Sequence, residues 1–238
     1  MKNLIGFIIL FPLTLILILG YLGLIPYLSD FIGPKPKNLG IMVSQTAYDD
    51  YYKKSGIKQE GLSAKTSVTE SIKFIGTHPV RESFSGEEIS SMASFRKWVY
   101  FPFTKTQVRF NSDGTAEASG VLKFNTGFQW LLAIGVAPAD IEKGMAIAKI
   151  PKMDLPFYVK VNGSVKNNRV ITDILQLEIG RITIPQTFVK QYTPAVERFV
   201  EDKFIRERHG VDIQSMTVQD SKVIFDGTLP DIEATANQ

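Results

Sequence analysis

Side chains that could perform catalytic chemistry are few and scattered in this sequence. It has two histidines, His78 and His209, and no cysteine. Neither histidine belongs to a Glu-x-x-His spacing. His78 precedes a proline, as loop residues do, and His209 stands beside Gly210 at an expected helix end, where the helix dipole favours a cation. The missing thiols exclude cysteine nucleophiles, zinc–thiolate clusters and iron–sulfur sites. We therefore expect no metal and no cofactor.

The acidic residues offer no acid–base pair at the level of sequence. Asp49–Asp50 and Glu87–Glu88 are neighbours within expected helices, so their side chains point in different directions and are typical of solvated or capping charges. The chain also lacks a Walker loop, a Rossmann glycine fingerprint and a G-x-S-x-G elbow. A hydrolase would need carboxylates that only the tertiary structure brings together, and we expect a protein that is not an enzyme.

Aromatic residues are the more informative candidates. The stretch Arg96–Phe103 mixes basic and aromatic side chains, a composition that favours the bilayer interface. It predicts a membrane-interface site made of Arg96, Lys97, Trp98 and Tyr100. The alternative is a helix-to-strand junction whose aromatic rings belong to the core.

A second aromatic set predicts a binding groove. Phenylalanines on a long helix could line the concave side of a curved sheet, and the apolar stretch around Trp130 could line a cavity. The alternative is ordinary core packing. The expected ligand-binding residues are Phe128, Trp130, Phe157, Phe188, Phe199 and Phe204.

The first 28 residues predict a membrane anchor. Leu4–Leu28 carries no charge, and 25 helical residues reach roughly 37 Å, more than the ~30 Å of a bilayer's hydrocarbon layer. A cleaved signal peptide is the rival interpretation, but the apolar run is too long and no A-x-A-like cleavage site follows it. We expect the N-terminus in the cytoplasm and the C-terminal domain outside the cell membrane.

Composition indicates one moderately sized globular body after the anchor. The chain has 27 Lys and Arg against 24 Asp and Glu, a net charge of +3, which is too small to suggest nucleic acid as a partner. The expected organisation is a cytoplasmic tip and anchor in residues 1–28, a tether in 29–38, a domain in 39–230 and a frayed tail in 231–238.

Periodicity predicts the elements of that domain. A Ser44-capped helix ends at Gly56, a strand covers 64–74, and a capping box at Ser85–Glu88 starts another helix. Alternating apolar residues predict further strands, and 3.6-residue spacing predicts helices. These remaining elements are strands near 108–124, helices over 126–149, a hairpin over 157–179 turning at Asn167–Asn168, a long amphipathic helix over 186–208 and a final hairpin over 211–229.

Three of the expected strands contain an interior glycine: Gly120, Gly163 and Gly227. Interior glycines mark bulges or bends, so they favour a strongly curved sheet, although chance among 18 glycines is the alternative. The predicted fold class is α+β, with an N-terminal transmembrane helix followed by a curved antiparallel β-sheet packed on a long amphipathic helix.

The chain resembles the uncharacterised YpmS-like proteins of Gram-positive bacteria, which carry a single membrane anchor. The resemblance lies in the anchor, the helix start Ser85–Ser90, the interior glycines and the run Ile179–Pro185 into an amphipathic helix. The chain also looks distantly like the tubular lipid-binding (TULIP) architecture. That resemblance implies a curved sheet wrapped on a long helix around a lipid-holding seam, and it carries no catalytic residues.

Two functional hypotheses follow. In the first, a non-catalytic envelope protein binds a lipid or another amphiphile in an apolar groove. In the second, an anchored scaffold or sensor binds another envelope protein. Both have the lipid bilayer as a partner.

Overall fold

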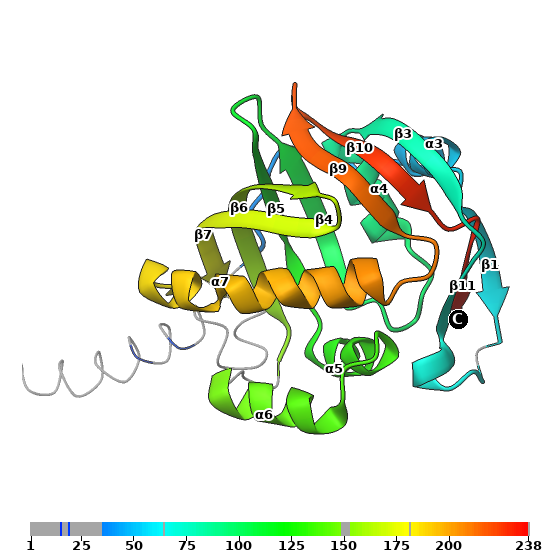
Figure 1. The fold of residues 1–238 in the computed structure, drawn as a ribbon. Helices are drawn as coiled ribbons and strands as arrows, with labels where there is room; N and C mark the ends of the chain where they lie inside the picture. Colours follow the sequence, from blue (N-terminus) through cyan, green and yellow to red (C-terminus); the bar gives the residue numbers. More distant parts are fainter. Residues whose placement is uncertain are drawn as a thin grey trace, which may run out of the picture.

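The computed structural model describes residues 35–63, 65–148, 153–180 and 182–237, together with Leu15 and Leu19 (Figure 1). Apart from Leu15 and Leu19, the predicted anchor, Leu4–Leu28, lies outside the described residues, as does most of the predicted tether. Within the described part, no helix is both long and apolar enough to cross a membrane.

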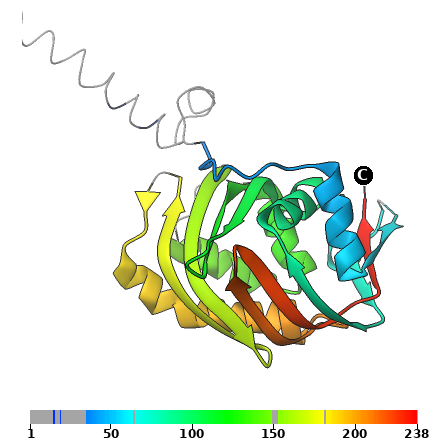
Figure 2. The ribbon, with the colours of Figure 1, turned by 90° about the horizontal axis from the view of Figure 1, so that it is seen from above.

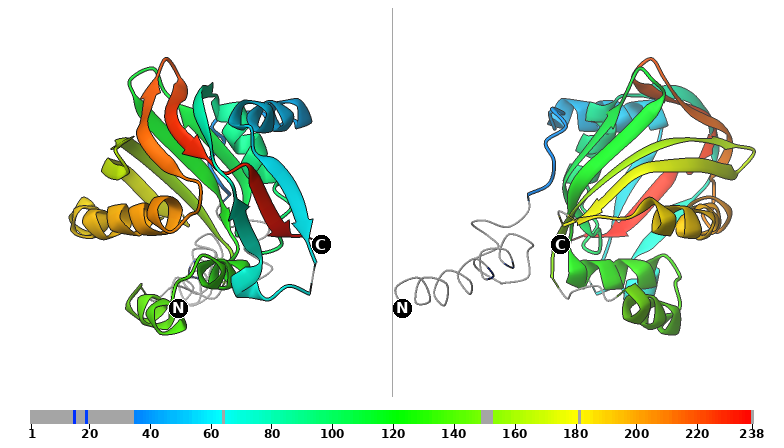
Figure 3. Two further views of the ribbon diagram at one scale, coloured as in Figure 1. Left: turned by 45° about the vertical axis from the view of Figure 1, so that its right-hand side comes forward. Right: turned by 90° about the vertical axis from the view of Figure 1, so that its left-hand side faces the viewer.

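The domain is α+β, with a curved antiparallel sheet and several helices (Figures 1 and 3). Neighbouring strands of the main sheet follow the order β3-β10-β9-β6-β5-β4, and β7 pairs with the other side of β6. The strands are β3 (His78–Phe84), β4 (Phe103–Phe110), β5 (Thr115–Leu122), β6 (Leu155–Lys166), β7 (Arg169–Ile179), β8 (Ile182–Thr183), β9 (Asp212–Gln219) and β10 (Lys222–Leu229).

Helices flank this sheet, and a smaller sheet lies beside it. The helices are α3 (Gln45–Ser55), η1 (Val68–Glu70), α4 (Gly86–Phe95), α5 (Phe124–Ala133), α6 (Pro138–Ala148), α7 (Gln186–Val200) and η2 (Glu201–Arg206), the last a π-helical turn. The smaller sheet has the order β1 (Lys58–Leu62), β11 (Ile232–Ala236), β2 (Ile72–Ile75).

Local sequence signals explain most of these boundaries. The Ser44 hydroxyl accepts from the Ala47 amide, and Ser85 and Glu88 form a reciprocal capping box, so both predicted helix starts are confirmed. Asn167 and Asn168 have φ angles of 49° and 62°, the left-handed values that a two-residue hairpin turn requires. The predicted strand over 64–74 is wrong in part, because Val68–Glu70 forms a 3-10 turn and the strand begins at Ile72.

The predicted curvature of the sheet is confirmed, and Gly227 shows one cause. The pairing of β10 with β9 shifts between Asp226 and Gly227, and a Cβ on Gly227 would lie 2.1 Å from the carbonyl oxygen of Asp212. A bulge of this kind bends its strand and increases the local twist. Only glycine lets the two backbones approach this closely.

Two helices cover free edges of the curved sheet. Along β7, the Val170 and Thr172 amides donate to Glu201 (2.9 Å) and Glu197 (2.8 Å), carboxylates that lie four residues apart on the α7–η2 helix. Along β4, the Ser90 hydroxyl of α4 accepts from the Val108 amide at 2.7 Å. An uncovered edge would present unpaired backbone groups to other chains, so these contacts satisfy and protect both strands.

The buried core lies against the sheet and reaches η2. Its buried residues are Val80, Phe84, Val165, Ile205, Ile213, Val223 and Phe225. Ile205, on the π-helical turn, is only 3% exposed. The long amphipathic helix thus inserts its C-terminal end into the core, whereas its N-terminal turns carry exposed apolar side chains.

The prediction of a frayed tail over 231–238 is wrong. Residues Ile232–Ala236 form β11, which pairs with β1 on one side and with β2 on the other. Ala234 and Ala236 are 2% and 1% exposed. Small residues permit this close packing at the centre of a sheet, and tertiary contacts override the local sequence signal, which is that of an acidic chain end.

Truncation after Pro230 should therefore unfold the smaller sheet. Loss of β11 leaves β1 and β2 unpaired and removes the Glu233 partner of Arg96, so we expect these two strands, Lys58–Leu62 and Ile72–Ile75, to become protease-sensitive. Limited proteolysis of the full chain and of the truncated chain measures this change. A cleavage pattern identical for the two chains would show that the tail is dispensable.

Candidate functional site

A chain of aromatic contacts, here called the aromatic seam, consists of Phe101, Phe103, Trp130, Phe157, Phe199 and Phe204. Phe103 is its centre. The centroid of the Phe103 ring lies 5.5 Å from the ring centroid of Phe101, 5.7 Å from that of Trp130 and 5.7 Å from that of Phe157. Trp130 continues to Phe204 at 5.9 Å, and Phe204 to Phe199 at 6.0 Å. All six side chains are half-buried, so the seam keeps part of its aromatic surface in contact with solvent.

Separate elements supply these rings. Phe103 starts β4 and Phe157 lies on β6, where Gly120 of the intervening β5 leaves room for it: a Cβ at Gly120 would lie 3.0 Å from the Phe157 ring. In an α-helix, Phe199 and Phe204 would be roughly 140° apart around the axis. The π-helical turn widens the helix and brings residues five apart closer to one face, which places these two rings in contact.

The structure brings four of the six predicted groove residues together: Trp130, Phe157, Phe199 and Phe204. Phe128 is half-buried on α5, and no aromatic contact joins it to the seam among the described residues. Phe188 does not join the seam: its side chain on α7 is 55% exposed, and no aromatic contact joins it to the seam among the described residues. Phe101 and Phe103 were missed as groove residues, because their neighbours in sequence favoured a membrane-interface assignment.

The predicted membrane-interface site is wrong for two of its residues. Trp98 is 4% exposed, and its Nε1 donates to the Ser71 hydroxyl at 3.1 Å. Arg96 donates to Glu233 at 2.6 Å, and both side chains are almost entirely buried. Lys97 is exposed and Tyr100 is half-buried. The core alternative therefore holds for Arg96 and Trp98, whose burial keeps them from contact with a bilayer.

A cationic cluster adjoins the aromatic seam, and sequence reasoning missed it. The Arg208 guanidinium lies 4.4 Å from the ring centroid of Phe74 and 5.1 Å from that of Phe204, and the Arg96 guanidinium lies 5.3 Å from that of Phe101. An arginine thus lies on Phe101 and another on Phe204, two rings of the seam. Burial, together with the Arg96 charge, lowers the pKa of Arg208 to about 10, and the Glu233 carboxylate opposes this shift. Arg208 is therefore still a cation at neutral pH.

The apolar pocket on the sheet is a second feature of this region. It has a volume of about 210 Å³ and an almost entirely apolar lining from several strands and the end of α7, including Phe110, Val161, Val165, Val170, Val200 and Met216. Val200 directly follows Phe199 of the seam, so the pocket and the seam share the same part of the long helix.

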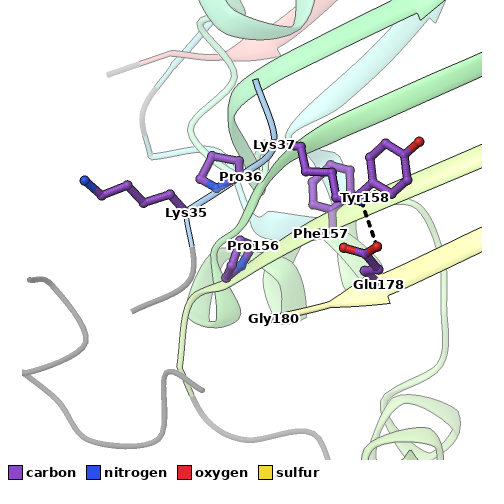
Figure 4. Close-up of a pocket in the computed structure, with 8 residues that line it drawn as sticks. All are labelled: Lys35, Pro36, Lys37, Pro156, Phe157, Tyr158, Glu178 and Gly180. Atoms are coloured by element: carbon purple, nitrogen blue, oxygen red, sulfur yellow. Dashed lines mark hydrogen bonds and ion pairs between the residues drawn. The ribbon is translucent and has the colours of Figure 1, made fainter. Parts of the chain in front are cut away.

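Another hollow, of about 380 Å³, lies where the described chain begins (Figure 4). Lys37 donates to Glu178 at 2.7 Å, and its ammonium lies 3.7 Å from the Tyr158 ring centroid. Leu39 is only 6% exposed. The end of the predicted tether is therefore docked on the sheet, on the side opposite α7 (Figure 2).

Exposed apolar side chains cluster on what we call the apolar flank, formed by the end of β7, β8 and α7. Its members are Ile179, Ile182, Phe188, Tyr192 and Val196, each 41–55% exposed. The structure describes α7 over its full length. Among the exposed residues of this helix, only Lys190 and Arg198 are charged.

His78 and the serines of two Ser-x-x-Lys spacings make structural contacts. His78 Nδ1 lies 2.9 Å from Asp231, and its Nε2 lies 2.8 Å from the Ser55 carbonyl oxygen, so both ring nitrogens are occupied by structural contacts. Two Ser-x-x-Lys spacings begin at Ser55 and Ser94, but both hydroxyls donate to backbone carbonyls. In the part of the chain that the structure describes, no three His, Asp or Glu side chains converge as a metal site.

Comparison of this chain with models of known protein families, with curated proteins and with solved structures finds no match.

The packing of Tyr51 against the buried core predicts sensitivity to alkali. Desolvation raises the pKa of Tyr51, which packs on Phe84, to about 12 from its ordinary 10.0. The folded state therefore keeps a proton that the unfolded state loses, and this contribution is full below pH 10 and is lost as the pH rises toward 12. Tyr51→Phe should reduce the fall of Tm between pH 9.5 and 11.5, relative to wild type.

The control for this measurement is Tyr192→Phe, because Tyr192 is 48% exposed. We expect its Tm profile to follow that of the wild-type protein. Equal slopes for all three proteins would contradict the assignment of the alkaline transition to Tyr51.

Proposed function

We propose that this protein is a non-catalytic, membrane-anchored protein outside the cell membrane that binds a lipid or another amphiphile along the aromatic seam. The observation that supports this proposal is the convergence of six half-buried rings from β4 and the residues just before it, β6, α5 and the α7–η2 helix. Binding sites for apolar ligands are typically lined by such surfaces, with a few polar groups nearby.

The energetics favour an apolar ligand over water on this surface. Each ring that passes from half-buried to fully covered removes apolar area from solvent, at roughly 25 cal/mol per Å². Six rings in continuous contact suit an extended hydrocarbon chain, which gains a little at every ring. The apolar pocket of about 210 Å³ near Val200 offers additional space for such a chain.

The proposed anchor places the domain next to the bilayer. Sequence places only six residues, 29–34, between the predicted anchor and Lys35, and Lys35 and Gly180 line the same hollow. The apolar flank begins beside Gly180, at Ile179 and Ile182. Apolar side chains accompanied by Lys190 and Arg198 have the composition of surfaces that rest on anionic lipid.

Binding is tested with seam variants of the full chain. Trp130→Leu combined with Phe204→Leu should leave the fold intact and reduce the amount of co-purified amphiphile at least about fivefold, because two consecutive rings of the seam are lost. Native mass spectrometry of the protein released from detergent measures the bound mass. The matched control, Phe188→Leu, removes an aromatic ring on the apolar flank and should change nothing.

If wild-type protein carries no amphiphile and takes up none from labelled membranes, the proposed binding function is wrong. A single protein adduct after cross-linking in cells, together with an empty seam, would instead favour the scaffold or sensor hypothesis.

Location is tested separately. Carbonate at pH 11 should leave the full chain in the membrane pellet, and protease added to intact cells should remove the domain. A variant with Leu15→Arg and Leu17→Arg should be released by the same wash, because charged residues at the centre of a span are costly. Release of the wild-type chain would contradict the anchor.

A further inference from the structure

Arg208 is a half-buried cation, and the described residues supply no hydrogen-bond acceptor for its guanidinium. Its guanidinium can donate five hydrogen bonds, yet the structure records none from it, only the contacts with the faces of Phe74 and Phe204. An arginine in an apolar setting ordinarily donates to a carboxylate or a carbonyl group, because desolvating an unpaired charge is costly.

The nearby charges do not balance either. Glu233 is paired with Arg96 at 2.6 Å, and the raised pKa of Tyr51 keeps that phenol neutral. Arg96 and Arg208 with one Glu233 leave one positive charge in excess. In addition, the Nε of Arg96 is buried and has no hydrogen-bond partner within the described chain. Among the described residues, the cluster therefore carries one positive charge that no carboxylate balances.

The position at which an anion would balance this charge follows from the aromatic contacts. Arg208 lies on Phe204, and Arg96 lies on Phe101, so the two guanidinium groups adjoin the two ends of the contact path Phe101–Phe103–Trp130–Phe204. An apolar seam with a cation at its end matches a molecule that has a hydrocarbon chain and an acidic head group.

We propose that Arg208 binds the anionic head group of an amphiphile, a carboxylate or a phosphate, whose hydrocarbon chain lies on the aromatic seam. This assignment rests on the proposed function and narrows it to acidic amphiphiles. The planar guanidinium fork suits both oxyanions, because each offers two oxygen atoms at the right separation.

The test uses membranes that contain the full chain and three photoreactive probes. Diazirine-bearing palmitic acid carries a carboxylate, diazirine-bearing phosphatidylglycerol carries a phosphate, and diazirine-bearing hexadecanol is the neutral match of the acid. After irradiation, labelled peptides are mapped and quantified. We expect the wild-type seam peptides, around Trp130 and Phe199–Phe204, to be labelled at least about tenfold more by an acidic probe than by the alcohol.

Arg208→Gln should abolish that preference by lowering labelling with the acidic probe to the level of the alcohol, without changing labelling by the alcohol. Arg208→Lys keeps the charge and should retain part of the preference. The matched control is Arg206→Gln, two residues away, because Arg206 is exposed and already paired with Glu201 and Asp202. It should label as wild type does.

Thermal unfolding separates binding from folding. The Arg208 guanidinium donates no described hydrogen bond, so Arg208→Gln should keep a Tm within a few degrees of the wild-type value. If that variant does not fold, the comparison of acid with alcohol on the wild-type protein still decides the proposal.

The outcomes distinguish the two proposals. Which acidic probe labels the seam identifies the source of the anion. Equal labelling by acid and alcohol, or labelling by the acidic probes that survives Arg208→Gln, would overturn the head-group site and leave amphiphile binding intact. Absence of seam labelling by all three probes would overturn the proposed function itself.

Discussion

The arrangement of this domain depends on hydrogen bonds that satisfy the backbone groups at the edges of its strongly bent sheet. A bent sheet that does not close leaves strand edges with unpaired backbone groups, and each buried unpaired group would cost about 1–3 kcal/mol. Glu197 and Glu201 meet the amides along β7, and Ser90 meets the Val108 amide along β4. These contacts fix where the long helix runs, and the helix in turn carries Phe199, Phe204 and Arg208 to the site.

The π-helical turn, Glu201–Arg206, determines which side chains at the end of the long helix meet. It follows the helical segment that is hydrogen-bonded to β7, and it precedes β9. It places Ile205 in the core, where the side chain is only 3% exposed, and it allows the rings of Phe199 and Phe204 to contact each other. A regular helix over the same residues would separate those two rings. π-helical turns occur frequently at functional sites, which agrees with the position of this one between the core and the aromatic seam.

The small sheet contributes charge as well as packing. β11 supplies Glu233, which neutralises Arg96, and it runs beside the junction that holds Trp98. Breaking a buried ion pair by removing one partner typically costs about 3–5 kcal/mol. The C-terminal strand therefore supports the arginine cluster directly through Glu233, and no carboxylate of the described residues forms an ion pair with Arg208.

Local sequence was sufficient for the elements whose signals are local. Ser44, the Ser85–Glu88 capping box and Asn167–Asn168 each act over a few residues, and the structure follows them. The glycines predicted the bend for the same reason, since a missing Cβ is a local property. The absence of cysteine and of known catalytic motifs was likewise evident from the sequence, as was the apolar composition that predicts an anchor.

Only the tertiary structure decided which aromatic residues meet and which charges are left over. Trp98 and Arg96 have an interfacial composition, but long-range contacts with Ser71 and Glu233 bury them. Phe188 shares a helix with Phe199, yet it is exposed because burial depends on what packs against each turn, not on the side chain alone. The charge excess at Arg208 involves Phe74, Arg96 and Glu233, which are distant in sequence and have no local signal in common.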